Sequence, residues 1–354
     1  MNLVTEHPCV VTGCSSFIGG HVVSQLLHKG YKVRGTVRSK EHSQYQHLLR
    51  LVGGDTNLEI VEADLRDPES WEKVFEGGVE YVFHVAAPYT LRPDDPEHTL
   101  IEPMVGGTQH ILEMCQKTAS VKKLIFTSCM AAVSDDWDND TVYDEEHWNV
   151  MSSLTRNSYS YAKALSEMAC TNFAARPDCT FKLVSMLPFV VLGPPIGPNL
   201  SFSHKFLMSF LNKQIRVILD ISYNISDVRD VAIAQVLAME HDEIEGRYCF
   251  CNDALKLETL LQIVHETFHG IDLPTKKVSN FAVKLLTRGD SSFRGEFLQH
   301  NLGKIPKVNC NRAIAAGMFM RPSVQTIVDT VRYIIDKRFL EAPLETRAVT
   351  CSIM

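Results

Sequence analysis

Short apolar runs alternate with helical patterns across the first half of the chain. Residues 17–30 place Ile18, Val22 and Leu26 on one helical stripe, and Gly30 can close that helix. Strands separated by helices form βαβ units, so we expect an α/β fold with a Rossmann-type doubly wound parallel sheet and helices on both faces. The predicted strands are residues 8–13, 31–37, 58–65, 79–87, 121–128 and 180–188.

The pattern changes after Leu187. The following stretch, PFVVLGPPIGPNLS, is rich in Pro and Gly, and the strand–helix alternation weakens. We predict a Rossmann domain over residues 1–187, a smaller substrate-binding region over 188–340 and a flexible tail over 341–354. Parts of residues 223–250 are expected to pack back on the sheet.

Composition and charge narrow the class of protein. With 354 residues, 45% of them hydrophobic and 22% charged, the chain has the composition of a soluble globular protein with one large or two joined domains. A net charge of −7 without a basic block gives no footprint for nucleic acid. Ten cysteines without a C-x-x-C pair favour reduced thiols and a cytoplasmic location. There is no signal-peptide pattern, and no apolar run reaches the roughly 18 residues of a spanning helix.

The first predicted strand ends in the turn VTGCSSFIGG. Gly13 and Gly19 bracket this turn, and glycine lets the backbone approach a pyrophosphate closely. The helix that follows begins around Ser16, Phe17 and Ile18, and a helix N-terminus offers free N–H groups to phosphates. Ser16 stands where the general fingerprint has its middle glycine, so the fingerprint is incomplete. We interpret the turn as a dinucleotide-binding site, with a tight structural turn as the alternative.

The residue about 20 positions beyond such a turn distinguishes the two nicotinamide dinucleotides. An acidic side chain there would bind a ribose 2′-hydroxyl and repel a 2′-phosphate. Here the second strand ends in VRGTVRSK, which puts Arg38 in that place and Lys40 near it. Cations match a phosphate, so NADPH is favoured over NADH; solvated basic residues at a strand end are the alternative.

The stretch RNSYSYAKALSE holds the candidate catalytic pair. Tyr159 and Lys163 are four residues apart, so a helix places them on one face. Tyr161 lies about 200° around the helix from Tyr159, on the other side. A Y-x-x-x-K spacing alone is common on surface helices, so this pair depends on the motifs around it.

Several motifs occur together in one order, and they carry a family likeness. They are VTGCSSFIGGHVVSQLLHKGYKVRGTVRS, ADL at 63, VFHVAAP at 82, DPE at 95, NSYSYAKALSE, LGPP at 192 and DVRDVAIAQVLAMEH at 227. The chain resembles the extended short-chain dehydrogenase/reductases, and more narrowly the dihydroflavonol reductase and cinnamoyl-CoA reductase-like group. The likeness covers about residues 8–335.

This resemblance implies an NADPH-dependent reductase of an aldehyde or ketone. Tyr159 would donate a proton to the carbonyl oxygen, while Lys163 would bind the nicotinamide ribose and lower the pKa of Tyr159. Tyr161 would pack or line the pocket. The turn and the resemblance together assign NADP(H) binding to Gly13, Ser16, Phe17, Ile18, Gly19, Arg38, Lys40, Asp64, Leu65, His84, Val85, Ala86, Tyr159, Lys163 and Pro188.

One position departs from the family pattern. The family carries Thr-Ser-Ser after the fifth strand, and its second serine hydrogen-bonds the substrate carbonyl; this chain has Cys129 there. A thiol is a weak donor beside a hydroxyl. Activity could persist through Tyr159 and Lys163, a nearby Ser128 or Ser134 could substitute, or the chain could be a catalytically impaired NADP-binding regulatory protein. A redox role for Cys129 would need a low pKa.

The expected partner is a small carbonyl substrate with an apolar body. The position where plant flavonoid enzymes have an asparagine is Ser134, so we do not predict a flavonoid. The expected pocket walls are residues 88–94, 130–136, 188–210 and 220–226, with Met130, Trp137, Phe189, Phe202 and Phe206; plain core packing is the alternative. Enzymes similar to 3β-hydroxysteroid dehydrogenases or sugar-nucleotide epimerases remain the alternative classes.

Three other patterns need an interpretation. VHETFHG contains H-E-x-x-H, which could place His265 and His269 on one helix face for zinc, but a zinc hydrolase is disfavoured and we predict no metal. The segment CFC at 249–251 puts two thiols on one strand face, and we interpret them as core residues and not as a metal site. The final residues, CSIM, form a C-a-a-X box, which predicts farnesylation of Cys351 and at most weak membrane association; a chance ending is the alternative.

Overall fold

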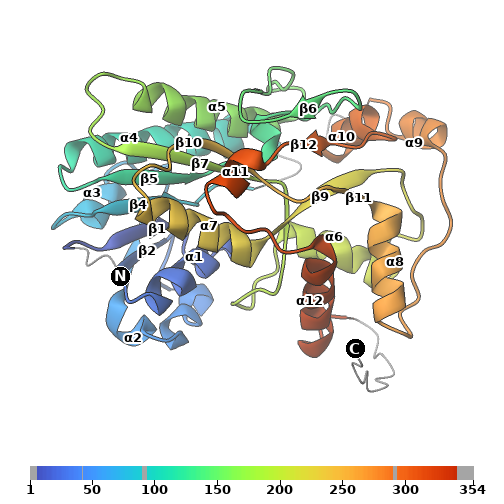
Figure 1. Cartoon of the computed structure of the whole chain (residues 1–354), viewed down its shortest axis with the longest axis horizontal. Coiled ribbons are helices and arrows are strands. Elements are labelled where there is room, and N and C mark those ends of the chain that lie inside the picture. The colour runs from blue at the N-terminus through green and yellow to red at the C-terminus, as the bar shows by residue number, and fades with distance from the viewer. Residues whose placement is uncertain (1–5, 42, 90–93, 290–292, 341–354) are drawn as a thin grey trace.

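The computed structural model describes residues 6–41, 43–89, 94–289 and 293–340, and its centre is a sheet of seven parallel strands (Figure 1). Their order from edge to edge is β10, β7, β5, β4, β1, β2 and β3. The chain starts mid-sheet, builds outward to β3 and then crosses over to build the other half, which confirms the predicted doubly wound Rossmann-type sheet. The strands are β1 (Cys9–Thr12), β2 (Val33–Val37), β3 (Leu58–Glu62), β4 (Tyr81–His84), β5 (Lys123–Thr127), β7 (Lys182–Pro188) and β10 (Gly246–Phe250).

Alternating side chains of the central strands enter two cores on opposite faces of the sheet. On β1, Cys9 and Val11 pack with helices α1 and α7, whereas Val10 packs with α3, α4 and α5. Figure 1 shows these two helix layers on either side of the strands. Their bounds are α1 (Phe17–His28), α3 (Ser70–Phe75), α4 (Gly107–Lys117), α5 (Ser158–Ala174) and α7 (Val228–Glu240).

Helix α1 ends as its sequence predicts. Gly30 has a φ of 84°, a left-handed conformation that glycine adopts without strain. The chain then reverses, and the Tyr31 N–H donates to the Leu26 carbonyl at 3.0 Å. This closure directs the chain into β2, next to β1.

The second half of the chain contributes a strand to the main sheet and forms a smaller sheet with its own core beside it. Strands β8 (Val190–Leu192) and β9 (Ser222–Asp227) pair in parallel, and β11 (Ala254–Lys256) adds antiparallel to β9. A separate core joins them to α6 (Phe202–Leu211), α8 (Leu257–Thr267) and α12 (Ser323–Asp336). Between these segments, α7 packs against α1, and β10 pairs with β7 in the main sheet. The domain division at residue 187 stays a prediction.

Shorter elements connect these layers. Strand β6 (Val142–Tyr143) pairs with β12 (Lys307–Val308), and a π-helical segment at Glu97–Gly106 leads into α4. The remaining helices are α2 (Gly54–Asn57), α9 (Asn280–Leu286), α10 (Phe293–Asn301) and α11 (Asn311–Ala315), with single 3₁₀ turns at Ser43–Tyr45, Leu48–Arg50 and Met130–Ala132.

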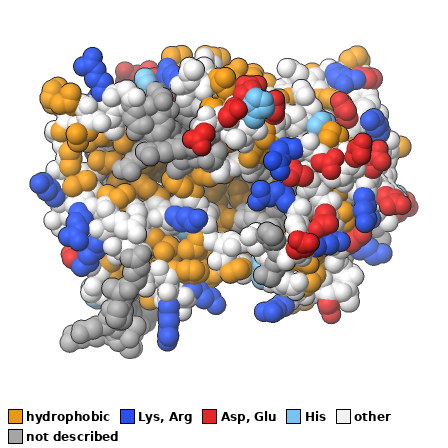
Figure 2. All heavy atoms as spheres, turned by 180° about the vertical axis from the view of Figure 1, so that it is seen from behind, with side chains coloured by type: hydrophobic (Ala, Val, Ile, Leu, Met, Phe, Trp, Pro, Cys, Tyr) orange, Lys and Arg blue, Asp and Glu red, His pale blue; other side chains and the backbone are white. Residues whose placement is uncertain are grey.

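The charge distribution on the surface bears on the prediction about nucleic acid, and the C-terminal tail bears on the prediction of weak membrane association. On the face shown in Figure 2, the basic side chains of the described residues are scattered among acidic and apolar ones. No helix within the described ranges is long and apolar enough to cross a bilayer. Cys351 and the predicted tail lie outside the described residues, so farnesylation stays a prediction.

Candidate functional site

The turn between β1 and α1 has the backbone geometry of a phosphate cradle. Gly13 has a φ of 63°, and a Cβ on Gly19 would lie 2.4 Å from the Gly13 carbonyl oxygen, so both positions require glycine. Ser16 caps the helix, because its Oγ accepts from the Gly19 N–H at 3.1 Å. The N–H groups of Phe17 and Ile18 have no carbonyl one turn earlier in the helix, which leaves them available to an anion.

The side chains of Phe17 and Ile18 are engaged in packing. The Phe17 ring lies edge-on to the His204 ring, with centroids 4.7 Å apart, and Ile18 packs against the core under α1. Their predicted part in cofactor binding therefore rests on backbone N–H groups. On its outer side the turn is bordered by His47 and by the segment 195–199. A Cβ on Gly197 would meet the His47 ring at 2.5 Å.

Arg38 comes directly after β2, and its side chain is exposed. The pKa of Asp64 is lowered, first by hydrogen bonds from Arg66 at 2.8 and 3.1 Å and further by the charge of Arg38. Arg38 and Asp64 therefore lie near each other where β2 and β3 end. Lys40 is exposed, and Leu65 is half-buried against the start of α4.

His84, at the end of β4, is buried in a chain of hydrogen bonds. Thr108 Oγ1 donates to the Met104 carbonyl at 2.6 Å, so it accepts from His84 Nε2 at 3.1 Å. His84 Nδ1 then accepts from Thr12 Oγ1 at 3.0 Å. Burial lowers the pKa of His84 to about 3, so the ring is neutral. Both ring nitrogens are thus engaged in joining β1, β4 and α4, and neither is free for the cofactor.

Val85 and Ala86 carry the chain from β4 past the glycine turn. Both N–H groups donate to Thr12 Oγ1, at 3.0 and 2.9 Å. A Cβ on Gly13 would lie 3.1 Å from Ala86, so Ala86 lies directly against the turn. Thr12 was not among the predicted site residues; its position immediately before Gly13 is the sequence signal that marks it.

The carboxyl end of β5 brings the three predicted catalytic residues together. Tyr159 and Lys163 lie one turn apart on α5, and Cys129 follows β5 by two residues. The Tyr159 hydroxyl lies close enough to the Cys129 thiol for each group to shift the pKa of the other. Lys163 Nζ donates to the Thr127 carbonyl at 3.2 Å, and its charge acts on the Cys129 thiol.

A capped N-terminus positions helix α5. Asn157 has a φ of 54°, and its side chain accepts from the Ser160 N–H at 3.3 Å. Asn157 Nδ2 also donates to the buried Asp135 carboxylate at 2.9 Å. The cap therefore ties the start of the helix to the loop that follows Cys129.

Burial governs the protonation of the catalytic groups. It raises the pKa of Tyr159 well above its ordinary value, with Cys129 and Tyr89 adding to the shift. It also raises the pKa of Cys129, against the opposing charge of Lys163, and lowers the pKa of Lys163. Burial outweighs any lowering of the Tyr159 pKa by Lys163 here, and the ammonium is bound to a backbone carbonyl, so the expected effect of Lys163 on Tyr159 stays a prediction. Tyr159 is a neutral phenol with a proton to donate.

Neither nearby serine takes the place of the missing hydroxyl. Ser128 Oγ donates to the buried Glu167 carboxylate at 2.6 Å. Ser134 Oγ donates to the Asp136 carbonyl at 3.0 Å. The interpretation in which Ser128 or Ser134 substitutes is thus not supported, because both hydroxyls are already engaged, whereas Cys129 contacts the phenol on α5.

One aromatic ring borders the Tyr159 side chain, and a second ring packs against the first. The Tyr89 ring lies edge-on to Tyr159 at 4.9 Å and tilted against Phe202 at 5.5 Å. Tyr89 is 44% exposed and Phe202 is 40% exposed, so both are accessible for an apolar ligand. Met130 and Trp137 are fully buried, so for these two the core-packing alternative is correct.

Three further predicted site residues come from the second half of the chain, and two of them pack against aromatic rings of the cores. Pro188 is buried at the end of β7. The next residue, Phe189, packs edge-on against Trp137 with ring centroids 5.3 Å apart. Phe206 on α6 packs in the same way against Tyr223 at 6.0 Å.

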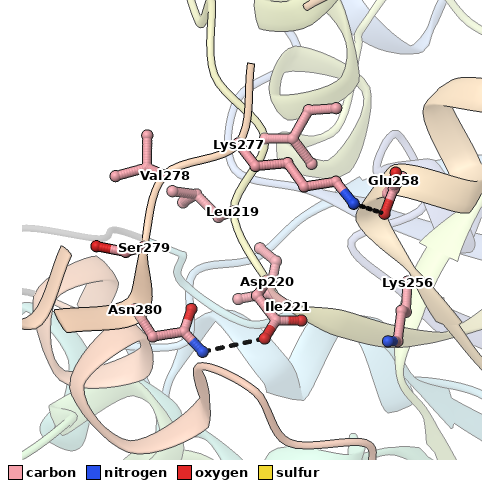
Figure 3. A pocket seen from close by; sticks show the side chains of 10 residues that line it. Leu219, Asp220, Ile221, Lys256, Glu258, Lys277, Val278, Ser279 and Asn280 are labelled. Atoms are coloured by element: carbon pink, nitrogen blue, oxygen red, sulfur yellow. Dashed lines mark hydrogen bonds and ion pairs between the residues drawn. The ribbon is translucent and has the colours of Figure 1, made fainter. Parts of the chain in front are cut away.

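A cavity of about 350 Å³ lies away from this centre, beside the start of β9, β11 and the segment before α9 (Figure 3). In it Lys277 pairs with Glu258 at 2.7 Å, and Asn280 donates to Asp220 at 3.0 Å. None of the predicted catalytic or cofactor residues lines it. This cavity is therefore separate from the constellation around Tyr159.

The H-E-x-x-H stretch does not form the helical pair that a zinc hydrolase needs. Helix α8 ends at Thr267, so His265 lies on the helix and His269 lies beyond it. Across the described residues, no three His, Cys, Asp or Glu side chains are grouped as a metal site.

Residues 9–249, more than half of the chain, match the NAD dependent epimerase/dehydratase family. The chain belongs to this family. Cinnamoyl-CoA reductase 2 of Medicago truncatula is 33% identical over 270 residues, which are 75% of this chain and 78% of that protein. The bifunctional dihydroflavonol 4-reductase/flavanone 4-reductase of Malus domestica is 33% identical over 289 residues, 78% of this chain and 80% of that protein.

Solved structures of this family share the fold over nearly the whole chain. Yeast methylglyoxal/isovaleraldehyde reductase Gre2, complexed with NADPH, superposes with a TM-score of 0.77 at 25% identity and covers 94% of this chain and 99% of its own. The predicted relationship to extended short-chain reductases is confirmed, and the chain is an oxidoreductase, as predicted.

Proposed function

We propose that this chain reduces an aldehyde or ketone to an alcohol with NADPH, with Tyr159 as the proton donor. The observation that carries the proposal is the neutral Tyr159 phenol, which lies beside Cys129 and one helical turn from Lys163 at the carboxyl end of β5. Strands β5, β4 and β1 are neighbours, so their carboxyl ends bring Tyr159 and the glycine turn to one edge of the sheet. Ligands of doubly wound sheets bind at that edge.

The residues present fit an NADP(H) cofactor. The cradle at Gly13 and Gly19 has no room for a Cβ, so it suits close approach by a pyrophosphate. Arg38 is exposed where the 2′-phosphate would lie. Lys163 would keep its bond to the Thr127 carbonyl and direct its remaining donors to the nicotinamide ribose. The bound cofactor supplies the hydride.

The protein's own part in the reaction is to bind and protonate the carbonyl oxygen. Tyr159 O–H donates to that oxygen and transfers its proton as negative charge develops there. Cys129, kept as a thiol by burial, gives a second and weaker hydrogen bond to the same oxygen. Tyr89 and Phe202 would contact the apolar body of the substrate, which supports a hydrophobic carbonyl compound.

Oxidation of NADPH by the purified protein, followed at the nicotinamide absorbance, tests this proposal against a panel of aldehydes, ketones, steroids and flavonoids. We expect turnover of apolar aldehydes or ketones, and turnover slower by about 10³-fold with Tyr159→Phe at the same concentration. Tight NADPH binding without turnover of any panel member would favour the regulatory alternative over catalysis.

A cytoplasmic location is part of the same proposal. The nine described cysteines are all free thiols, which suits a reducing compartment. The partner is the small carbonyl substrate, and any weak membrane association would come from a lipid at Cys351. Intact-mass measurement of protein from its native cells tests that modification.

A further inference from the structure

Cys251 and Cys310 bring two thiols into contact from segments 59 residues apart. Their Sγ atoms lie 3.9 Å from each other, and Cys310 Sγ lies 3.2 Å from the Cys251 carbonyl oxygen. Both side chains are buried, in a cluster with Met130, Trp137 and Leu187. Among the described cysteines, no other pair of sulfur atoms makes such a contact.

We propose that Cys251 and Cys310 form a reversible disulfide when the protein meets a hydroperoxide. A sulfur–sulfur bond is about 2 Å long, so the two atoms must approach each other by roughly 2 Å. Cys251 comes just after β10 and Cys310 just before α11, so neither residue is held inside a strand or helix. Rotation of the two side chains, with a small shift of these connecting segments, can close that distance.

The two thiols have different roles in the reaction. We assign the first step to Cys310, whose sulfur lies at the start of α11 and whose pKa the hydrogen bond from the Cys251 thiol lowers. The Cys310 thiolate attacks the O–O bond of the hydroperoxide, forms a sulfenic acid and releases an alcohol, or water when the oxidant is hydrogen peroxide. Cys251 then loses its proton and attacks the sulfenic sulfur, forming the S–S bond and releasing water. Two thiols are oxidised and one peroxide bond is reduced.

The disulfide would link the edge strand of the main sheet to α11. A crosslink that closes a long loop restricts the unfolded chain, so the oxidised protein should melt at a temperature higher by about 5 °C. Cys249 is the matched control. It lies on β10 two residues from Cys251 and is also buried, but among the described cysteines its sulfur makes no sulfur–sulfur contact like that of Cys251 with Cys310.

Tryptic digestion gives a direct readout in the full-length protein. Residues 248–256 form the peptide YCFCNDALK, and residues 308–312 form VNCNR. The protein is exposed to graded hydrogen peroxide, its remaining thiols are blocked with N-ethylmaleimide in denaturant, and the digest is sequenced by mass spectrometry. We expect these two peptides to be linked, with fragment ions that place the bond on Cys251, and to separate after treatment with dithiothreitol.

Variants sharpen the test. Cys251→Ala and Cys310→Ala should abolish the linked peptide and the rise in melting temperature, whereas Cys249→Ala should keep both. The absence of the linked peptide in wild type, at a peroxide dose that already oxidises the half-buried Cys179, would overturn the proposal. A bond that maps to Cys249, or sulfinic acid at Cys310 without the disulfide, would overturn it as well.

Discussion

Replacing Cys129 by serine changes the hydrogen-bond donor beside Tyr159 without changing its place in the loop. Removing a full donor from a developing oxyanion costs enzymes about 2.7–4 kcal/mol. Here Tyr159 remains as one donor, and Cys129 already gives a weak bond, so only part of that energy is to be regained. An oxygen also lies closer to Cβ than a sulfur, so the serine hydroxyl reaches less far. We therefore expect about 1.4 kcal/mol, which is about tenfold in kcat.

The gain should appear in the chemical step. Burial raises the pKa of Cys129, so the wild-type residue is a neutral thiol at pH 7, and its replacement by a hydroxyl changes donor strength and not charge. Cys129 is placed beside the Tyr159 phenol and not at the glycine turn. The dissociation constant of NADPH should therefore stay within about twofold, which steady-state kinetics and fluorescence titration measure separately.

Two control variants complete this experiment. Cys129→Ala removes the donor, so kcat should fall about tenfold. Ser134→Ala changes a hydroxyl that bonds to a backbone carbonyl, and kcat should not change. If Cys129→Ser loses activity and mild thiol alkylation inactivates wild type, the cysteine has a chemical role of its own. If the serine and alanine variants both match wild type, Cys129 makes no bond to the substrate.

Three further predictions use other parts of the site. Tyr159→Phe should lower kcat by about 10³-fold while NADPH binding persists, and Tyr161→Phe should stay active; the reverse result would contradict the assignment. Arg38→Glu should weaken the binding of NADPH about 100-fold in titrations and the binding of NADH less than about threefold, because the contact that is lost is the one to the 2′-phosphate. Equal losses of affinity for the two dinucleotides would refute that contact. Burial lowers the pKa of His84 to about 3 and the pKa of His21 to about 4. As the pH falls below about 6.5, both side chains therefore take up a proton in the unfolded chain while they stay neutral in the folded protein. Their contribution to stability is full well above pH 6.5 and is lost as the pH falls, by an average of about 2.3 kcal/mol per pH unit between pH 6 and 4. Urea titrations that show no such slope would contradict this prediction.

The strands were predictable because buried parallel strands are continuous apolar runs. The ends of the strands were harder to predict, and the fourth strand shows why. Residues 79–87 are apolar and were predicted as one strand, but β4 covers only Tyr81–His84. Val85 is apolar because it packs in the core beneath α1, and Ala86 because it lies against the glycine turn, while both N–H groups donate to Thr12 instead of a neighbouring strand. Sequence shows that such residues are apolar but not which backbone group they bond.

Contacts between distant segments account for most of what the sequence left open. Parts of residues 223–250 were expected to pack back on the sheet, and β10, within this range, in fact extends the sheet as a seventh strand. Met130 and Trp137 were equally suited to a pocket wall or a core, because both environments select apolar side chains. Tyr89 lay within a predicted wall, but its contact with Tyr159 depends on the position of α5.

The departure at Cys129 is best understood together with the serine before it. Neighbouring residues in an extended chain point to opposite sides, so Ser128 and Cys129 face different partners. Ser128 holds the buried Glu167 carboxylate, which also accepts from Arg247 Nε at 2.8 Å, so β5 and β10 fix the position of α5 through one acid. Moving the hydroxyl from 128 to 129 would leave that buried carboxylate short of a donor, at a cost of about 1–3 kcal/mol. The network that fixes α5, and with it Tyr159, therefore requires serine at 128 and leaves position 129 alone to set the strength of the second donor.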